Sequence, residues 1–219
     1  MIEGILFDSG GVLMGPRGGR WWPIYGFEQA VLAHAPDTSF DALDTALLPA
    51  MAYMDQTHPN EDWREFYRIV VLGLGVAPTQ AMLDDIAAIK PSDAVDLFPD
   101  VLPCLRRLQA RGLAMAVVSD AWPNLPDIHT ALGIQHFFSG YAISSVVGCS
   151  KPDPRMYAAG ARALNRAAST LLFVDDSDDL VQAAIDLGYH GVALCRSGTP
   201  PAAPVPWITS LDALDQYLS

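Results

Sequence analysis

The protein has 219 residues and a formal net charge of −12, because 25 acidic side chains outnumber 13 basic ones. No basic stripe is available to neutralise the phosphates of a nucleic acid or of an anionic membrane, so we expect neither partner. Hydrophobic residues make up 51% of the chain. No apolar run approaches the roughly 18 residues that span a bilayer, and we therefore expect a globular, cytoplasmic protein.

Short, unbroken apolar runs predict the strands of a parallel sheet, because a strand covered on both faces shows no alternation. The runs are 4–7, 113–118, 141–147, 171–174 and 191–194. Helical patterns occur between the later runs and after the last of them, at 100–111, from Asp153 onward, at 178–187 and at 210–218. This alternation predicts an α/β fold with a doubly wound, Rossmann-type parallel sheet of about five strands.

A segment without a convincing strand interrupts this alternation after the first strand. Residues 25–89 contain four helical patterns, at 27–34, 40–54, 62–72 and 79–89. Glycines and prolines mark both edges of the segment. We therefore predict a core domain of residues 1–18 and 92–219 and a small inserted helical cap domain of residues 19–91.

Polar side chains follow four of the predicted strands. They are Asp8, Ser9 and Gly10 after the first, Ser119 and Asp120 after the second, Lys151 beyond the third, and Asp175 and Asp176 after the fourth. The carboxyl ends of parallel strands meet at one edge of a sheet, where ligands bind. Clustered carboxylates need a cation among them, and oxygen ligands suit Mg²⁺. A hydroxyl and an ammonium beside that cation are what a phosphoryl group requires, and an aspartate can attack its phosphorus.

Four segments of the chain resemble the ordered motifs of the haloacid dehalogenase superfamily. They are FDSGGVL at 7–13, VVSDA at 117–121, SKPDPRMY at 150–157 and FVDDSDD at 173–179. The resemblance covers nearly the whole chain, including a helical cap inserted just after the first motif. It implies that Asp8 is the nucleophile and that Ser119 and Lys151 hold the phosphoryl oxygens. Asp120 is assigned to the same phosphate site, with capping of the following helix as the alternative.

The resemblance also implies a Mg²⁺ site, formed by Asp8, the carbonyl of Gly10, Asp175 and Asp176, with the role of Asp179 left open. The expected reaction is the hydrolysis of a small phosphate monoester, such as a sugar phosphate, through an aspartyl-phosphate intermediate. The expected partner is therefore this small-molecule ester, and the sequence leaves the oligomeric state open.

One position departs from the pattern of similar phosphatases. Gly10 stands where they carry a second aspartate, which protonates the leaving group. Water, or Asp55 or His58 from the cap, would then supply the proton. A halide leaves without a proton, so a 2-haloacid dehalogenase is an alternative function, as is a binding or scaffold protein of low activity. Asp175 and Asp176 favour the phosphatase, because dehalogenases of the superfamily hold no metal. The five histidines show no ligand spacing and are expected to be structural or exposed.

Overall fold

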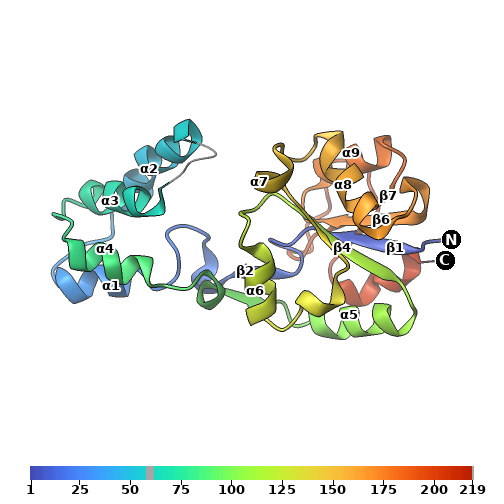
Figure 1. Ribbon diagram of the computed structural model, residues 1–219, viewed down its shortest axis with the longest axis horizontal. Coiled ribbons are helices and arrows are strands. Elements are labelled where there is room, and N and C mark those ends of the chain that lie inside the picture. Colours follow the sequence, from blue (N-terminus) through green and yellow to red (C-terminus); the bar gives the residue numbers. More distant parts are fainter. Residues whose placement is uncertain (58–61, 219) are drawn as a thin grey trace. The chain divides into compact units, whose positions relative to one another are not determined.

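The computed structural model describes residues 1–57 and 62–218 (Figure 1). The chain forms two compact units, one of residues 1–15 and 97–219 and the other of residues 16–96. The segment predicted as a cap, residues 19–91, lies within the second unit.

The first unit is built on a six-stranded parallel sheet with the order β5-β4-β1-β6-β7-β8. The strands are β1 (Gly4–Phe7), β4 (Ala114–Ser119), β5 (Tyr141–Ile143), β6 (Leu171–Asp175), β7 (His190–Leu194) and β8 (Trp207–Ile208). β1 lies in the middle and pairs with β4 on one side and with β6 on the other. All four residues of β1 are buried. The predicted α/β fold is confirmed, with one more strand than expected.

Helices cover both faces of this sheet (Figure 1). They are α5 (Val101–Ala110), α6 (Leu125–Ala131), α7 (Ser144–Val147), α8 (Pro154–Leu164) and α9 (Asp178–Asp186), with a 3₁₀ helix η5 at Leu211–Tyr217. Figure 1 shows α8 and α9 on one face and α5 on the other. The core under α8 and α9 includes Leu6, Phe173, Met156 and Tyr157, all fully buried. Shorter 3₁₀ turns occur in this unit at Gln135–Phe137 and Ala168–Thr170, and in the second unit at Arg17–Gly19 and Pro91–Ala94.

The strand predicted at 141–147 is wrong in its second half. The strand ends at Ile143, and Ser144–Val147 form the helical turn α7. The hydroxyl of Ser144 accepts a hydrogen bond from the amide of Ala121 at 3.0 Å, and that of Ser145 donates to the carbonyl of Ala121 at 2.9 Å. These bonds fix the chain in a turn and leave the Val146 side chain exposed.

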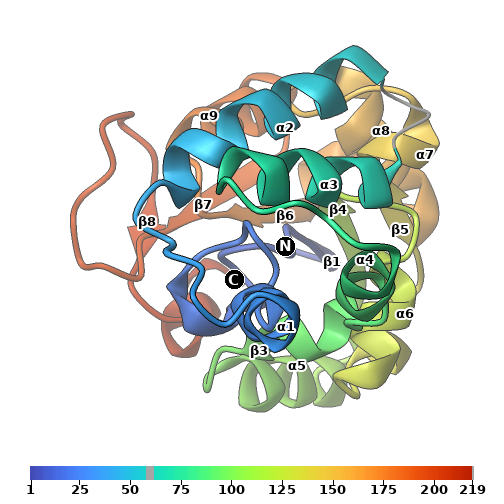
Figure 2. The same ribbon diagram turned by 90° about the vertical axis from the view of Figure 1, so that its left-hand side faces the viewer.

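Among its described residues, the second unit contains four α-helices, α1 (Phe27–His34), α2 (Leu43–Thr57), α3 (Trp63–Gly73) and α4 (Gln80–Ala87). The side chain of Asp62 caps α3, and that of Thr79 caps α4. Helices α2 and α3 lie side by side (Figure 2), where Gly73 packs directly against Ala46. All four elements follow the predicted helical patterns. The connecting strands β2 (Met14–Pro16) and β3 (Val95–Leu97) pair with each other.

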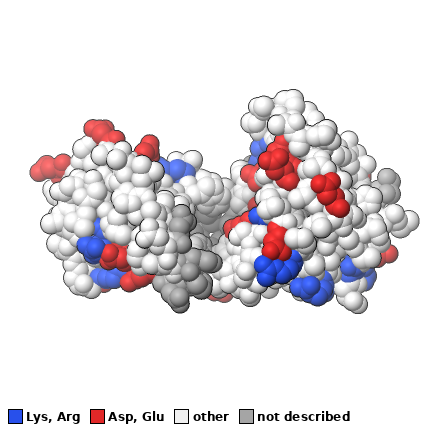
Figure 3. All heavy atoms as spheres, turned by 90° about the horizontal axis from the view of Figure 1, so that it is seen from above, with Lys and Arg blue, Asp and Glu red and all other residues white. Residues whose placement is uncertain are grey.

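Two whole-chain expectations concern membranes and charge. In the part of the chain that the structure describes, no helix is both long enough and apolar enough to cross a bilayer. On the face drawn in Figure 3, basic side chains lie among acidic ones instead of forming one continuous stripe.

Candidate active site

The polar residues that follow the strands are brought together at the carboxyl edge of the sheet. Asp8 follows β1 directly, Ser119 ends β4 and Asp175 ends β6. Lys151 comes from the turn that precedes α8. All four are buried, with exposed fractions of 7% for Asp8, 3% for Ser119, 9% for Lys151 and 1% for Asp175. Buried polar groups of this kind are costly unless they are hydrogen-bonded or paired, and these four residues form hydrogen bonds and ion pairs with one another.

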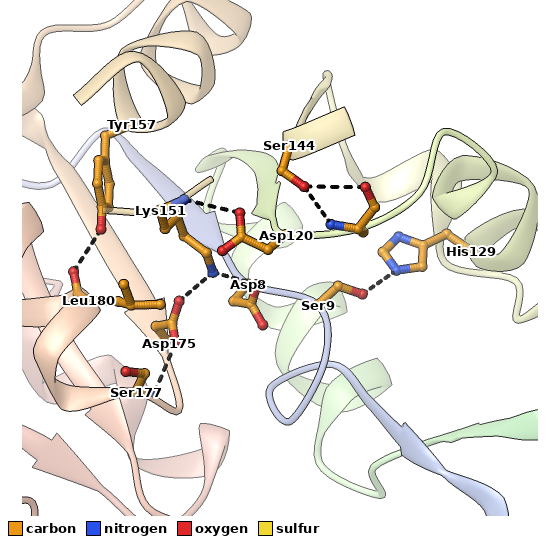
Figure 4. A network of polar contacts seen from close by, with 11 residues as sticks. Asp8, Ser9, Asp120, His129, Ser144, Lys151, Tyr157, Asp175, Ser177 and Leu180 are labelled. Atoms are coloured by element: carbon orange, nitrogen blue, oxygen red, sulfur yellow. Dashed lines mark hydrogen bonds and ion pairs between the residues drawn. The ribbon is translucent and has the colours of Figure 1, made fainter. Parts of the chain in front are cut away.

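Lys151 lies between two aspartates (Figure 4). Its Nζ atom donates to Oδ1 of Asp8 at 2.7 Å and to Oδ2 of Asp175 at 2.6 Å. Burial disfavours the charge on the Lys151 ammonium, but the two carboxylates outweigh that effect and raise its pKa above the ordinary value. The ammonium is therefore charged at neutral pH and holds both carboxylates in fixed positions.

Asp8 has an unusual electrostatic environment for a carboxyl group. Burial raises its pKa to about 7, and the negative charge of Asp175 acts in the same direction. Lys151, by its charge and its hydrogen bond, and a hydrogen bond from Ser119 both act against this rise. A cation beside Asp8 would favour its charged, nucleophilic form further.

Asp120 holds the backbone of Lys151. Its Oδ1 accepts a hydrogen bond from the Lys151 amide at 3.0 Å (Figure 4), and burial raises the pKa of its carboxyl. On the other side of Lys151, the Asp153 carboxylate caps α8 by accepting from the amide of Arg155 at 2.9 Å. Asp120 thus contacts the lysine that was predicted to share its phosphate site, and Asn124 is the residue at the N-terminus of the next helix, α6.

The segment after Asp8 is a tight turn. The Ser9 carbonyl accepts hydrogen bonds from the amides of Leu13 at 2.9 Å and Met14 at 3.0 Å. Gly11 has φ of +78°, and a Cβ there would collide with the carboxylate of Asp176. A glycine at this position therefore both permits the turn and leaves room for that carboxylate.

His129 is a buried residue whose place in the site was not predicted. It is fully buried, and its Nε2 lies 2.8 Å from the hydroxyl of Ser9, next to Asp8 in the chain (Figure 4). Its Nδ1 lies 3.0 Å from the hydroxyl of Tyr141. Burial lowers the pKa of His129 to about 4, so the ring is neutral at pH 7. The sequence gives one weak signal for this residue, namely that His129 lies on a predicted helix after the second motif. That position is compatible with a structural role but does not indicate a contact with Ser9.

Three carboxylates could hold a metal ion. Asp8, Asp175 and Asp176 each offer an oxygen atom, and these atoms all lie within 4.8 Å of one another. Burial, followed by the charge of Asp175, raises the pKa of the Asp176 carboxyl. One ammonium cannot balance three carboxylates, and the all-oxygen donor set suits Mg²⁺. The residues present therefore fit this cation.

Other predicted site residues take different places. Gly10 directly follows the Asp8–Ser9 segment and forms a backbone bridge with Met14. Asp179 is exposed in the first turn of α9 and is not in the three-carboxylate group. Two cap residues were considered as sources of the proton that Gly10 cannot supply. Both the residue His58 and the side chain of Asp55 lie outside the described part of the chain.

Comparison with known proteins identifies the family. A family model described as haloacid dehalogenase-like hydrolase matches residues 2–188. The chain belongs to the haloacid dehalogenase-like hydrolases. The sequence-based assignment to this superfamily, and with it the assignment as a hydrolase, is confirmed.

Curated relatives of this hydrolase include several phosphatases. It is 36% identical over 126 residues to the enolase-phosphatase E1 of Erwinia tasmaniensis, an alignment that covers 56% of this chain and 54% of the relative. The chain thus matches about half the length of this relative. It is 29% identical to the enolase-phosphatase E1 of Nocardia farcinica over 98% of this chain and 97% of the relative.

Solved structures of the same fold include both phosphatases and dehalogenases. A haloacid dehalogenase superfamily phosphatase from Thermococcus onnurineus has a TM-score of 0.66 at 17% identity, covering 100% of this hydrolase and 98% of that chain. A defluorinating L-2-haloacid dehalogenase has a TM-score of 0.72 at 20% identity, covering 99% and 95%. At such identities the likeness concerns the fold alone.

Proposed function

We propose that this hydrolase is a Mg²⁺-dependent phosphatase that cleaves a small phosphate monoester, of the sugar phosphate type, through an aspartyl-phosphate on Asp8. The observation that carries the proposal is the arrangement of Asp8, Lys151 and Asp175, with Asp176 completing a group of three carboxylates. The enolase-phosphatase relatives support it, because they are named as phosphatases.

The proposed reaction has two steps. An oxygen of the Asp8 carboxylate attacks phosphorus, the bond from phosphorus to the ester oxygen breaks, and the departing oxygen takes a proton from a water molecule, which becomes hydroxide. A second water molecule then attacks the phosphorus of the aspartyl-phosphate and gives a proton to that hydroxide, the bond to Asp8 breaks, and inorganic phosphate leaves as the carboxylate is restored. Atoms and charge balance with water as the only co-reactant.

Each side chain of the site has a separate task in this proposal. Lys151, whose Nζ is 2.7 Å from Asp8, donates to a phosphoryl oxygen and stabilises the charge of the transition state. The hydroxyl of Ser119 donates a second hydrogen bond to the phosphoryl group. Asp120 fixes the backbone of Lys151. Mg²⁺ bound by Asp8, Asp175, Asp176 and the Gly10 carbonyl would neutralise phosphoryl charge.

A 2-haloacid dehalogenase is the second candidate, because Gly10 provides no acid at its position. A halide leaves without a proton, so this reaction has no need of an acid at position 10. The group formed by Asp8, Asp175 and Asp176 argues against it, because displacement of a halide requires no cation.

The deciding experiment measures hydrolysis of p-nitrophenyl phosphate with and without Mg²⁺, for the wild type and for Asp8→Asn. This ester has a good leaving group, so it needs little help from an acid. We expect turnover that requires both the metal and Asp8. If none occurs above the Asp8→Asn background, the phosphatase proposal fails, and release of chloride from 2-chloropropionate tests the dehalogenase. Failure of both reactions would leave a binding or scaffold role.

A further inference from the structure

Arg196 follows β7 and contacts the turn that comes after the nucleophile. Its Nε donates to the carbonyl of Gly11 at 3.0 Å, and its Nη2 donates to the carbonyl of Val12 at 2.7 Å. The guanidinium also stacks on Phe98, 3.9 Å from the ring centroid. Phe98 is also hydrogen-bonded to this segment, because its amide donates to the carbonyl of Leu13 at 3.2 Å. All these residues belong to the first unit.

Asp100 fixes the guanidinium in place. Nη1 and Nη2 of Arg196 each donate to one oxygen of this carboxylate at 3.0 Å, a planar two-bond pairing that only arginine can form. The carboxylate also accepts from the Ser210 hydroxyl at 2.9 Å and from the Leu211 amide at 2.8 Å. Although burial opposes it, these hydrogen bonds keep the pKa of Asp100 below its ordinary value. The ion pair is therefore present at neutral pH.

The turn held by Arg196 leads directly to the three-carboxylate group. Gly11 provides one of the two carbonyls bound by the guanidinium, and the space beside its Cα is occupied by the carboxylate of Asp176. Gly10, the preceding residue, lies between this point and the Asp8–Ser9 segment. A shift of the Gly11 backbone would therefore move both Gly10 and the space available to Asp176.

We propose that Arg196, oriented by Asp100, is a positioning residue for the metal site: it holds the Gly11 and Val12 carbonyls so that the backbone of Gly10 and the carboxylate of Asp176 keep their places beside Asp8. The inference rests on the proposed function as far as the metal is concerned. A lysine at position 196 would keep the charge, but one ammonium cannot reach two carbonyls and both carboxylate oxygens in one plane.

The first test needs no metal. Hydrogen–deuterium exchange is measured on the peptide that contains residues 9–14, for the wild type, Arg196→Lys and Arg107→Lys. Arg107 is a matched control, because it pairs with Asp215 at 2.8 Å and donates to the carbonyl of Leu211 at 3.0 Å without contacting this turn. We expect about tenfold faster exchange of the Leu13 and Met14 amides in Arg196→Lys alone. Equal rates in the two variants would overturn the proposed hold on the turn.

The second test measures metal affinity directly. Binding of Mn²⁺, used as a probe for Mg²⁺, is followed by the loss of the free-ion electron paramagnetic resonance signal. Removal of a group that orients metal ligands typically weakens binding 10- to 100-fold, and we expect a loss of about 10-fold for Arg196→Lys and none for Arg107→Lys. Methylguanidinium added to Arg196→Ala should restore part of the affinity, which a general loss of stability would not allow.

The outcomes separate this inference from the proposed function. Faster exchange in Arg196→Lys with unchanged Mn²⁺ affinity would refute the link to the metal site. A wild type that binds no Mn²⁺ would refute the metal-dependent function and the metal part of this inference together, and the exchange rates would still decide whether Arg196 holds the turn.

Discussion

Lys151 is one of only two lysines in the chain, and the other, Lys90, is exposed. Replacing Lys151 by methionine leaves the buried Asp8 and Asp175 without their shared partner. Breaking a buried ion pair typically costs about 3–5 kcal/mol, and we expect a loss of that order in the free energy of unfolding. Urea denaturation without added metal measures it, with Lys90→Met as the control.

Addition of Mg²⁺ should recover part of that stability in Lys151→Met, since a cation can replace the ammonium between the carboxylates. Turnover should still be lost, because no other buried cation lies at that point to hold a phosphoryl oxygen in the described chain. If Lys151→Met unfolds at the same urea concentration as Lys90→Met, the buried ion pair has no net stabilising effect.

His129 predicts how stability depends on pH. Its pKa is lowered from 6.5 to about 4 by burial, so the unfolded chain binds the proton more readily than the folded one. The folded state should therefore lose stability as the pH falls from about 6.5 toward 4, by up to roughly 3 kcal/mol from this group alone. Denaturation at pH 7 and pH 5 should show a smaller difference in His129→Gln, which does not titrate. A wild type and variant with parallel pH profiles would contradict this assignment.

Gly11, in the turn after β1, and Gly133, which follows α6, have different roles. Gly11 and Gly133 both have positive φ, at +78° and +75°, but only Gly11 has a neighbour, Asp176, where a Cβ would lie. Alanine at either position should cost roughly 1–2 kcal/mol through backbone strain. Only Gly11→Ala should also weaken Mn²⁺ binding, because it displaces a carboxylate of the proposed site. Calorimetric titration of both variants tests this, and equal affinities would remove Asp176 from the metal site.

Gly10 predicts a preference among leaving groups. Restoring an acid by Gly10→Asp should accelerate hydrolysis of a simple alkyl phosphate by about 10²-fold, the lower end of the usual effect of general acid catalysis. Hydrolysis of p-nitrophenyl phosphate should change only a few-fold, because its leaving group needs no proton. The ratio of the two rates is the measurement. An unchanged ratio would mean that another group already supplies the proton.

The elements that the sequence predicted well are those defined by local patterns. The apolar run of β1 and the capping residues Asp62 and Thr79 identify their elements without knowledge of the rest of the chain. Strand β8 has only two residues, one of them exposed, and therefore lacks a pattern. The turn at Ser144 depends on hydrogen bonds to Ala121, which local propensity cannot reveal.

The candidate site shows the same division between local and distant information. Asp8, Lys151 and Asp175 could be predicted to meet because each follows a strand or lies beyond one. The partners of His129 and Arg196 could not, since Ser9 and Gly11 are more than one hundred residues away in the chain. Such contacts arise from the packing of whole elements, so a single sequence without an alignment does not reveal them.

At the scale of the whole molecule, the division into two units predicts a separable core. A variant that joins Gly15 to Leu97 through a short glycine–serine linker omits the second unit. The sheet and its helices belong entirely to the first unit, so we expect native-like circular dichroism and preserved Mn²⁺ binding. A variant without cooperative unfolding would show that the core depends on the second unit.

The central place of β1 in the sheet also has a consequence for synthesis. Both neighbours of β1 come late in the chain, β4 more than one hundred residues afterwards and β6 later still. At roughly 5–20 residues per second, a ribosome needs on the order of 5–20 seconds after making β1 before its first partner exists. During that interval the apolar segment Gly4–Phe7 has no sheet to join. The nascent chain therefore depends on whatever shields this segment, such as the ribosome surface or a chaperone, until β4 is complete at Ser119.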